Sequence, residues 1–408
     1  MKILSKTKRK MLSGINKPSA GEQLYLLAFF IFLISETFST TMFQLPGSAY
    51  TLCKAVACLL LIIKVFRFDE FSRRTFFIFV LLILEAILVY VNSGYMEIFF
   101  WVLFVMGAKN VSFKKILKVY LIVTISIVLL AFCASMLHVI ENLQYTRGDG
   151  KRVRNSFGAI YTTDFASHIF MITMSAFYLL KDKLKTWHFI LGAVVGVLVY
   201  WFCNTRLDMG CLFLMLICFY CISQRYVANG RNIFSTGKAK KALPYSMPIA
   251  AGFMFVVSYF YSSGNPIFLA LDSFMSTRLK LGHKGLMKYG MTLFGQSIKM
   301  VGNGGTTKIS ASQYFFIDCS YLYIFLRYGV FFLLITLAVY MMCCKKFQND
   351  PYFIVVIILI SINCMIAHHI IELTYNPFAL ALFATAPHLE QRYCRSNNNK
   401  WSRLNLLK

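Results

Sequence analysis

Residues 117–138 read LKVYLIVTISIVLLAFCASMLH, and Lys118 is the only Lys, Arg, Asp or Glu in that stretch. A helix needs about 20 predominantly apolar residues to cross the hydrocarbon core of a bilayer. The stretch has that length, and it is apolar on every side, unlike a helix at the surface of a soluble protein. It predicts a membrane-spanning helix, and the rest of the chain repeats the pattern.

The composition of the whole chain leads to the same conclusion. Of 408 residues, 58% are hydrophobic and only 14% are charged, and the mean hydropathy is +0.63. One soluble core cannot bury that much apolar surface, so the bilayer must solvate it. We expect an all-α polytopic integral membrane protein, a single transmembrane domain over residues 1–408 with about twelve spans. The candidate spans lie near 23–43, 50–66, 75–92, 95–108, 117–138, 160–180, 186–203, 208–223, 244–262, 318–343, 352–372 and 376–388.

The Lys and Arg residues predict the orientation of these spans. Cytoplasmic loops of membrane proteins carry the positive excess. With the first residues inside, 29 of the 42 Lys and Arg fall on the cytoplasmic side, so both termini are expected in the cytoplasm. The formal net charge of +26 would indicate nucleic acid in a soluble protein. Because retention of cytoplasmic loops explains most of that charge, we expect no nucleic-acid partner.

The cations expected on the outer face gather in two loops and one short turn. The loop 263–317, between the ninth and tenth spans, has Asp272 as its only acidic residue and is longer than a helix connection requires. We infer an outer-face site for a polyanionic ligand; the alternative is a solvated surface near anionic headgroups. The cations are Arg147, Lys151, Arg152 and Arg154 in loop 139–159, Arg206 in the turn, and Arg278, Lys280, Lys284, Lys288, Lys299 and Lys308 in loop 263–317.

The first basic loop is typical of a phosphate site. Arg147, Arg152 and Arg154 stand near glycines just before an expected helix. Guanidinium groups match phosphate oxygens bidentately, and a helix N-terminus adds further N–H donors. A diphosphate at the membrane surface would fit, so we assign these residues, together with Arg206, to substrate binding.

The second basic loop and the span after it supply further candidates. Apolar residues around Arg278 and His283 are spaced as in a segment that lies on the membrane surface, where its cations can meet phosphates. Asp318 and Tyr321 open the tenth span, and Arg327 lies deeper, where an ionisable residue is costly and indicates function. We assign Asp318 and Arg278 to catalysis, with Asp318 orienting or deprotonating a hydroxyl, and the other three to binding.

His368, His369 and Glu372 cluster near the outer end of the eleventh span. Adjacent residues point to different faces of a helix, so we expect no metal site, and His369 with Glu372 is read as an acid/base or hydrogen-bonded pair. We assign His369 to catalysis and Glu372 to substrate binding. The 12 cysteines include no CxxC pair, and the chain has no Gly-rich GK[ST] loop. We therefore expect no cofactor.

Short motifs occur along the chain in a characteristic order. They are RNSFG at 154–158, TR at 205–206, RL at 278–279, LFG at 293–295, DCSYL at 318–322, YG at 328–329 and E…NPF over 372–378. In these motifs and their order the chain resembles the Wzy-type polymerases of O-antigen, capsular and exopolysaccharide repeat units. It resembles the O-antigen ligases more distantly.

The resemblance implies a metal-independent glycosyltransferase on the outer face of a bacterial cytoplasmic (inner) membrane. Its substrates would be undecaprenyl-diphosphate-linked oligosaccharides. A growing chain would leave its lipid diphosphate and join a sugar hydroxyl of the next unit, with Arg154, Arg206 and Arg278 holding the diphosphate. Membrane lipid, a flippase and a chain-length regulator would be its partners.

Three alternatives stay open. An O-antigen-type ligase would transfer the finished glycan to a different acceptor. A lipid-linked oligosaccharide flippase or other transporter would typically show internal repeats and broken mid-membrane helices, neither of which is evident in the sequence. A structural scaffold of an export complex would carry no chemistry at all.

Overall fold

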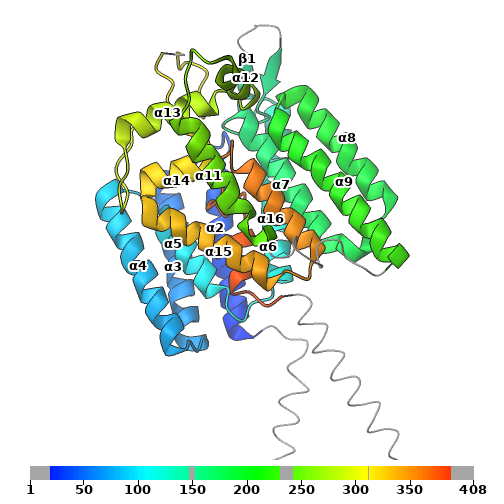
Figure 1. The fold of residues 1–408 in the computed structure, drawn as a ribbon. Coiled ribbons are helices and arrows are strands. Elements are labelled where there is room, and N and C mark those ends of the chain that lie inside the picture. Colours follow the sequence, from blue (N-terminus) through cyan, green and yellow to red (C-terminus); the bar gives the residue numbers. More distant parts are fainter. Residues whose placement is uncertain (1–18, 147–151, 230–241, 311, 387–408) are drawn as a thin grey trace, which may run out of the picture.

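The computed structural model describes residues 19–146, 152–229, 242–310 and 312–386. Most of these residues are helical, and they pack into one helix bundle (Figure 1). The first half contains α2 (Ala20–Ser39), α3 (Gly47–Phe68), α4 (Arg73–Ser93), α5 (Glu97–Gly107), α6 (Phe113–Met136), β1 (Gln144–Thr146), β2 (Val153–Asn155), α7 (Thr162–Leu180), η1 (Lys181–Lys183) and α8 (Thr186–Cys203). The second half contains α9 (Arg206–Asn229), η3 (Leu243–Tyr245), α11 (Ser246–Tyr259), α12 (Pro266–Phe274), α13 (Arg278–Tyr289), α14 (Ser320–Tyr328), α15 (Val330–Lys346), α16 (Pro351–Asn363) and η4 (Phe378–Leu382).

Six helices of the described ranges are long and apolar enough to cross a membrane, namely α2, α3, α4, α6, α8 and the Arg206–Gln224 part of α9. Their outward faces are apolar as well: Phe66 of α3 is 71% exposed and Val91 of α4 is 72% exposed. Exposed apolar side chains on long helices are what lipid contact requires. The chain is therefore a multi-pass membrane protein. The count of twelve spans and the cytoplasmic location of both termini stay predictions.

The last three expected spans differ from the structure. The span 318–343 is two helices, α14 and α15, which meet at Gly329. The span 352–372 ends early, because α16 stops at Asn363, and the span 376–388 contains only the short η4. Irregular backbone at such a depth is tolerated where it lies within protein or lines a cavity. These breaks bring several of the expected site residues together.

Two glycines explain the break between α14 and α15. Gly329 has φ +92° and Gly295 has φ +80°, which non-glycine residues rarely adopt. The two backbones touch: a Cβ at Gly295 would lie 2.5 Å from the Arg327 carbonyl oxygen, and a Cβ at Gly329 would lie 2.5 Å from the Gly295 nitrogen. The Val330 N–H also donates to the Thr292 carbonyl over 3.0 Å. This contact, which we call the glycine clasp, ties the segment after α13 to the end of α14.

The expected outer loops contain regular structure. In loop 139–159, β1 and β2 form an antiparallel hairpin in which Tyr145 pairs with Arg154, so the chain is not purely helical. Loop 263–317 contains α12 and α13. The hairpin, α12 and α13 lie at one end of the bundle, and the described chain begins and ends at the other (Figure 1).

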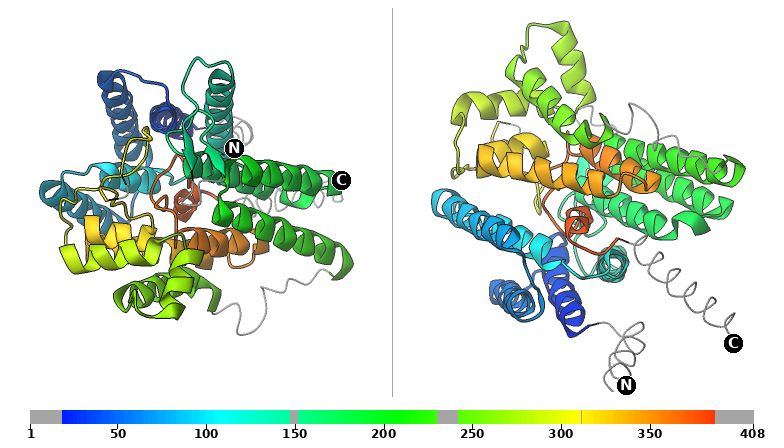
Figure 2. Two further views of the ribbon diagram at one scale, coloured as in Figure 1. Left: turned by 90° about the horizontal axis from the view of Figure 1, so that it is seen from above. Right: turned by 60° about the horizontal axis from the view of Figure 1, so that its bottom comes forward.

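The end of the bundle opposite the hairpin is closed by hydrogen bonds between distant segments. The Ser112 N–H donates to Glu22 Oε1 over 3.0 Å, and the Thr385 N–H donates to the Val111 carbonyl over 2.7 Å. Figure 2 shows α2–α5 on one side of the bundle, α8 and α9 on another, and η4 between them. Two of the cavities described below are lined by residues of the hairpin end.

Candidate functional site

Two adjoining cavities at the hairpin end form the cationic cleft. One cavity has a volume of about 310 Å³ and the other about 860 Å³, and Arg154, Tyr161, Arg278 and Tyr314 line both. Arg206 completes the first cavity, and Lys280 and Lys284 complete the second. Of the residues that line the two cavities, only Asp208 is acidic. The cleft therefore offers a strongly positive site.

Three separate elements supply the arginines of the cationic cleft. Arg154 belongs to β2, and its Nε donates to the Cys203 carbonyl at the end of α8 over 2.9 Å. Arg206 is the first residue of α9 and is exposed. Asp208 follows Arg206 closely but accepts hydrogen bonds from Ser167 (3.1 Å) and Asn363 (2.9 Å), so its charge is held on the bundle side.

The third arginine, Arg278, is positioned by an unusual backbone. The two preceding residues, Ser276 and Thr277, have φ +54° and +68°, and neither is a glycine. Such conformations cost about 1–3 kcal/mol each and persist where the surrounding contacts enforce them. Here the buried Asp272 accepts from the Lys280 N–H over 3.0 Å, and its carbonyl accepts from the Thr277 N–H over 2.8 Å. The turn directs the Arg278 guanidinium towards the irregular segment 364–377.

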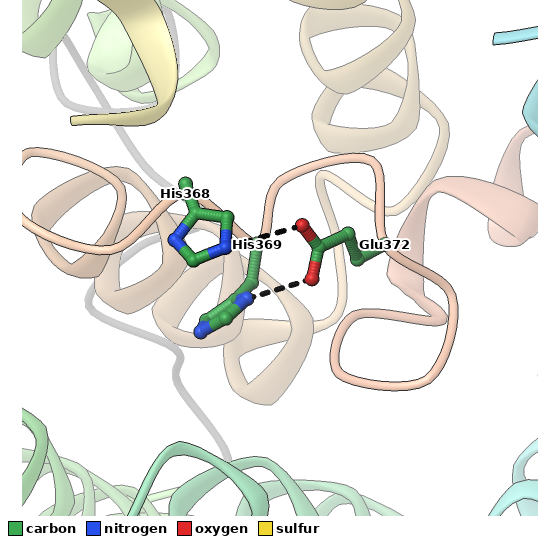
Figure 3. Close-up of side chains that lie close together, drawn as sticks. All are labelled: His368, His369 and Glu372. Atoms are coloured by element: carbon green, nitrogen blue, oxygen red, sulfur yellow. Dashed lines mark hydrogen bonds and ion pairs between the residues drawn. The ribbon is translucent and has the colours of Figure 1, made fainter. Parts of the chain in front are cut away.

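Arg278 leads from the cationic cleft to a buried group of ionisable side chains, Asp318, His368, His369 and Glu372, which we call the inner cluster. Arg278 Nη2 lies 2.9 Å from Asp318 Oδ2, and Asp318 Oδ1 lies 4.0 Å from His368 Nδ1. Glu372 contacts both histidines: Oε1 lies 3.4 Å from His368 Nε2, and Oε2 lies 2.9 Å from His369 Nδ1 (Figure 3). The ionisable groups thus form a continuous chain.

The inner cluster combines two kinds of proton acceptor. Asp318 and Glu372 are carboxyl groups, the first paired with Arg278 and the second in contact with both histidines. The rings of His368 and His369 offer nitrogen atoms in the same group. The cluster can therefore accept a proton either on a carboxylate or on an imidazole.

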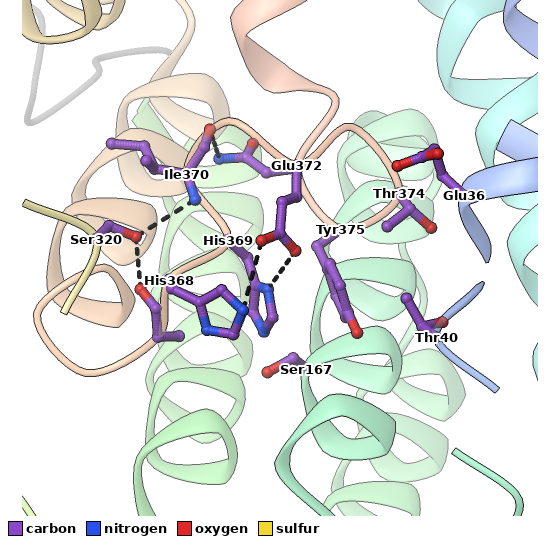
Figure 4. A network of polar contacts seen from close by, with 12 residues as sticks. Glu36, Thr40, Ser167, Ser320, His368, His369, Ile370, Glu372, Thr374 and Tyr375 are labelled. Atoms are coloured by element: carbon purple, nitrogen blue, oxygen red, sulfur yellow. Dashed lines mark hydrogen bonds and ion pairs between the residues drawn. The ribbon is translucent and has the colours of Figure 1, made fainter. Parts of the chain in front are cut away.

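Tyr375 stacks on the His369 ring and restricts its orientation (Figure 4). The Tyr375 ring lies between two imidazoles, with its centroid 3.7 Å from that of His369 and 4.1 Å from that of His168. His168 Nε2 is in turn 2.9 Å from the Thr40 hydroxyl of the turn after α2. The inner cluster is thereby tied to α2 and α7 and has little freedom to reorient.

The geometry of the inner cluster differs from the helix that was assumed when no metal was expected there. That expectation assumed a helix, but residues 364–377 are irregular, and donor atoms of His368, His369 and Glu372 lie within 4.8 Å of one another. The geometric reason against a metal is therefore wrong. The three side chains could supply nitrogen and oxygen ligands to one divalent ion. In the structure, two of these potential ligand atoms, His369 Nδ1 and Glu372 Oε2, are hydrogen-bonded to each other.

Several residues assigned to substrate binding from the sequence lie away from the cationic cleft. Arg152 stacks on the Trp201 ring, 5.1 Å from its centroid, on the outside of α8. His283 Nδ1 is 3.0 Å from the Ser258 carbonyl and holds α13 against α11. Tyr321 is fully buried and donates to a main-chain carbonyl, so we remove it from the site. Arg147 lies outside the described residues.

Arg327 faces a different side of the inner cluster. It lies at the end of α14, next to the glycine clasp, and its guanidinium stacks on Tyr95, 3.4 Å from the ring centroid. It also bonds to the Tyr323 hydroxyl and lies 3.7 Å from Glu97. Arg327 therefore lies beside Tyr95 and beside Glu97 of α5, and it does not line the cationic cleft.

Sequence reasoning missed the tyrosines of the cleft and its two lysines as site residues. Tyr161 and Tyr314 line both cavities, yet no local pattern distinguishes them from other tyrosines. Lys280 and Lys284 were counted only as loop charge. Their spacing of four residues, which places both on one face of a helix, is a signal that could have found them.

No protein-family model matches the chain, and neither a search of curated proteins nor a search of solved structures found a match. The resemblance drawn from the motifs therefore stays a hypothesis, which rests on the residues and on the site they form.

Proposed function

We propose that this chain is a membrane glycosyltransferase that joins polyprenyl-diphosphate-linked oligosaccharide repeat units into a polysaccharide, on the outer face of a bacterial cytoplasmic membrane. One observation carries the proposal. Arg154, Arg206 and Arg278, which lie far apart in the sequence, line one cleft in which Asp208 is the only acidic lining residue. A diphosphate leaving group is the ligand that such a cleft fits best.

The proposed reaction is a transfer at the anomeric carbon of the growing chain. Its bond to the lipid diphosphate breaks, a bond to an acceptor sugar hydroxyl forms, and the hydroxyl proton passes to the enzyme. The charge that develops on the departing diphosphate is met by guanidinium groups already in place, and such preorganised charge is usually the largest catalytic contribution.

The inner cluster supplies the proton acceptor in this proposal. Glu372 fixes His369 through Nδ1, which leaves Nε2 of the neutral ring as the basic atom. Asp318, held by Arg278, orients the hydroxyl or takes the proton itself. A base that lies beside the diphosphate site is what a transfer to a hydroxyl needs.

A transporter of lipid-linked units is the second candidate, and one observation favours it. The α14–α15 junction at Gly329 and the early end of α16 are broken helices inside the bundle. Discontinuous helices are typical of transporter binding sites, so the part of the sequence-based argument that rested on unbroken helices no longer holds. The part that rested on missing internal repeats is unchanged.

The test is the length of the glycans in cells with and without this chain, resolved on a gel. Loss of the chain should leave single lipid-linked units on the outer face and no ladder of longer products. Units that accumulate on the inner face would indicate a transporter, and long lipid-linked chains would indicate a ligase. An unchanged ladder would refute the proposal.

A further inference from the structure

A third cavity, of about 470 Å³, lies between α2, α3 and α5 and meets the inner cluster at Glu372. We call it the acidic pocket. Its polar lining includes three carboxylates, Glu36, Glu97 and Glu372, and one cation, Lys54. Lys54 is already paired with Glu36 over 2.8 Å. Glu97 lies 3.7 Å from Arg327, so Glu372 is the lining carboxylate without a Lys or Arg partner among the described residues. The lining still has more acidic than basic residues, unlike that of the cationic cleft.

The inner cluster separates the two cavities. Arg278 lines the cationic cleft and Glu372 lines the acidic pocket, and the contacts through Asp318 and His368 connect them. A ligand in either cavity thus reaches the same ionisable groups from its own side. An anion is favoured on one side and disfavoured on the other.

Five aromatic residues line the acidic pocket, namely Phe32, Tyr95, Phe99, Phe100 and Trp101. The apolar C–H faces of a sugar ring carry partial positive charge and pack well on such rings. Trp101 is 2% exposed and packs edge-on against Phe332, with 5.7 Å between the ring centroids, so it closes one wall of the acidic pocket.

A lipid chain or a phosphate suits this pocket poorly. Carboxylates facing hydrocarbon are costly, and carboxylates facing a phosphate repel it. A polyhydroxylated ligand without charge satisfies both parts of the lining, since its hydroxyls donate to carboxylates and its ring packs on the aromatic walls.

We propose that the acidic pocket binds the acceptor sugar, so that donor diphosphate and acceptor hydroxyl approach the inner cluster from opposite sides. This rests on the proposed transferase function and adds to it the place and chemistry of the acceptor. Glu97 is the most direct test residue, because its side chain is 48% exposed and Gln keeps its size while removing the charge that faces Arg327 over 3.7 Å.

The experiment uses the full chain in nanodiscs, with lipid-linked units from cells that lack it as donor. The acceptor is the same repeat unit freed from lipid and labelled fluorescently at its reducing end. Glu97→Gln should raise the labelled-unit concentration needed for half-maximal extension about tenfold or more, the effect of one lost hydrogen bond to a charged group. Phe100→Leu should raise it about threefold, because the sugar ring loses an aromatic face. Inhibition by methylenediphosphonate, a mimic of the donor diphosphate, should not change. The matched control is Glu141→Gln, at an exposed carboxylate that does not line the acidic pocket.

The outcomes separate the two proposals. If the wild-type chain extends neither the labelled unit nor the lipid-linked units, the transferase function itself fails. If the wild type extends the labelled unit and both variants match it, the acceptor assignment is overturned. Inhibition by free polyprenol that either variant relieves would also overturn it, because the pocket would then hold lipid.

Discussion

Replacing Arg278 should stop chain extension, and pairing that change with Asp318→Asn shows why. In the structure, Arg278 has a 16% exposed side chain and is 2.9 Å from Asp318, whose side chain is 14% exposed. Arg278→Ala alone leaves a buried carboxylate without its partner. Breaking a buried pair in this way costs about 3–5 kcal/mol. A lost ladder in the single variant would therefore have two possible causes, unfolding and loss of the donor site.

The double variant Arg278→Ala with Asp318→Asn separates these causes when it is compared with the Asp318→Asn single variant, which loses the same carboxylate but keeps Arg278. Without the carboxylate there is no uncompensated charge, so most of the lost stability should return. The donor site stays damaged, and removing one preorganised donor of this kind lowers a rate by about 10²–10³-fold. We expect a thermal midpoint close to that of the Asp318→Asn single variant, and glycans shorter than those that the single variant makes.

The assay pairs thermal unfolding of the purified variants with glycan length on a gel. Arg152→Ala is the matched control, because Arg152 stacks on Trp201 outside the cleft, and its ladder should remain. Ladders of wild-type length from a well-folded double variant would refute the role of Arg278 at the diphosphate.

The remaining predictions concern Tyr321, acidity and metals. Tyr321→Phe should lower stability by about 1 kcal/mol, measured by thermal unfolding, but keep the ladder, because the lost hydroxyl donates only to the core backbone. The extension rate should fall as the pH is lowered, because protonation of Glu372 removes the carboxylate that holds His369 through Nδ1. Chelation should leave extension of the purified chain unchanged, because the proposed transfer uses the arginines of the cationic cleft to stabilise the departing diphosphate.

Three results would contradict these expectations. A ladder lost in folded Tyr321→Phe would return that hydroxyl to the substrate site. An extension rate that does not fall with falling pH would remove Glu372 from the catalytic arrangement. Activity lost to a chelator and restored by a divalent ion would make the inner cluster a metal centre.

The sequence could indicate the cations of the site because charge placement follows rules that local sequence displays. Arg154, Arg206 and Arg278 were found as outer-face cations that retention in the cytoplasm could not explain, and the structure brings all three to one cleft. Arg152 satisfied the same rule but points elsewhere. The distribution of Lys and Arg predicts on which face of the membrane a residue lies, but not the direction in which its side chain points.

The inner cluster could be predicted only in part, because it depends on where helices end. The pairing of His369 with Glu372 was expected from their spacing and is confirmed at 2.9 Å. The contact of His368 with the same carboxylate was missed, because only the difference in direction between adjacent residues was considered, although His368 and Glu372 are also four residues apart. The apolar run continues past the end of α16 at Asn363, where the Cys364 carbonyl accepts from the Ser320 N–H over 2.9 Å, a contact that the sequence does not display.

The glycine clasp should restrict the substitutions that evolution can accept at these two positions. A side chain at Gly295 needs room that the Arg327 and Tyr328 backbone occupies, and a side chain at Gly329 needs the room of Gly295. Neither position can change alone without moving the other segment. Chains that descend from a common ancestor with this one should therefore keep both glycines or lose both together, and the pair would serve as a marker of the break that presents Arg327.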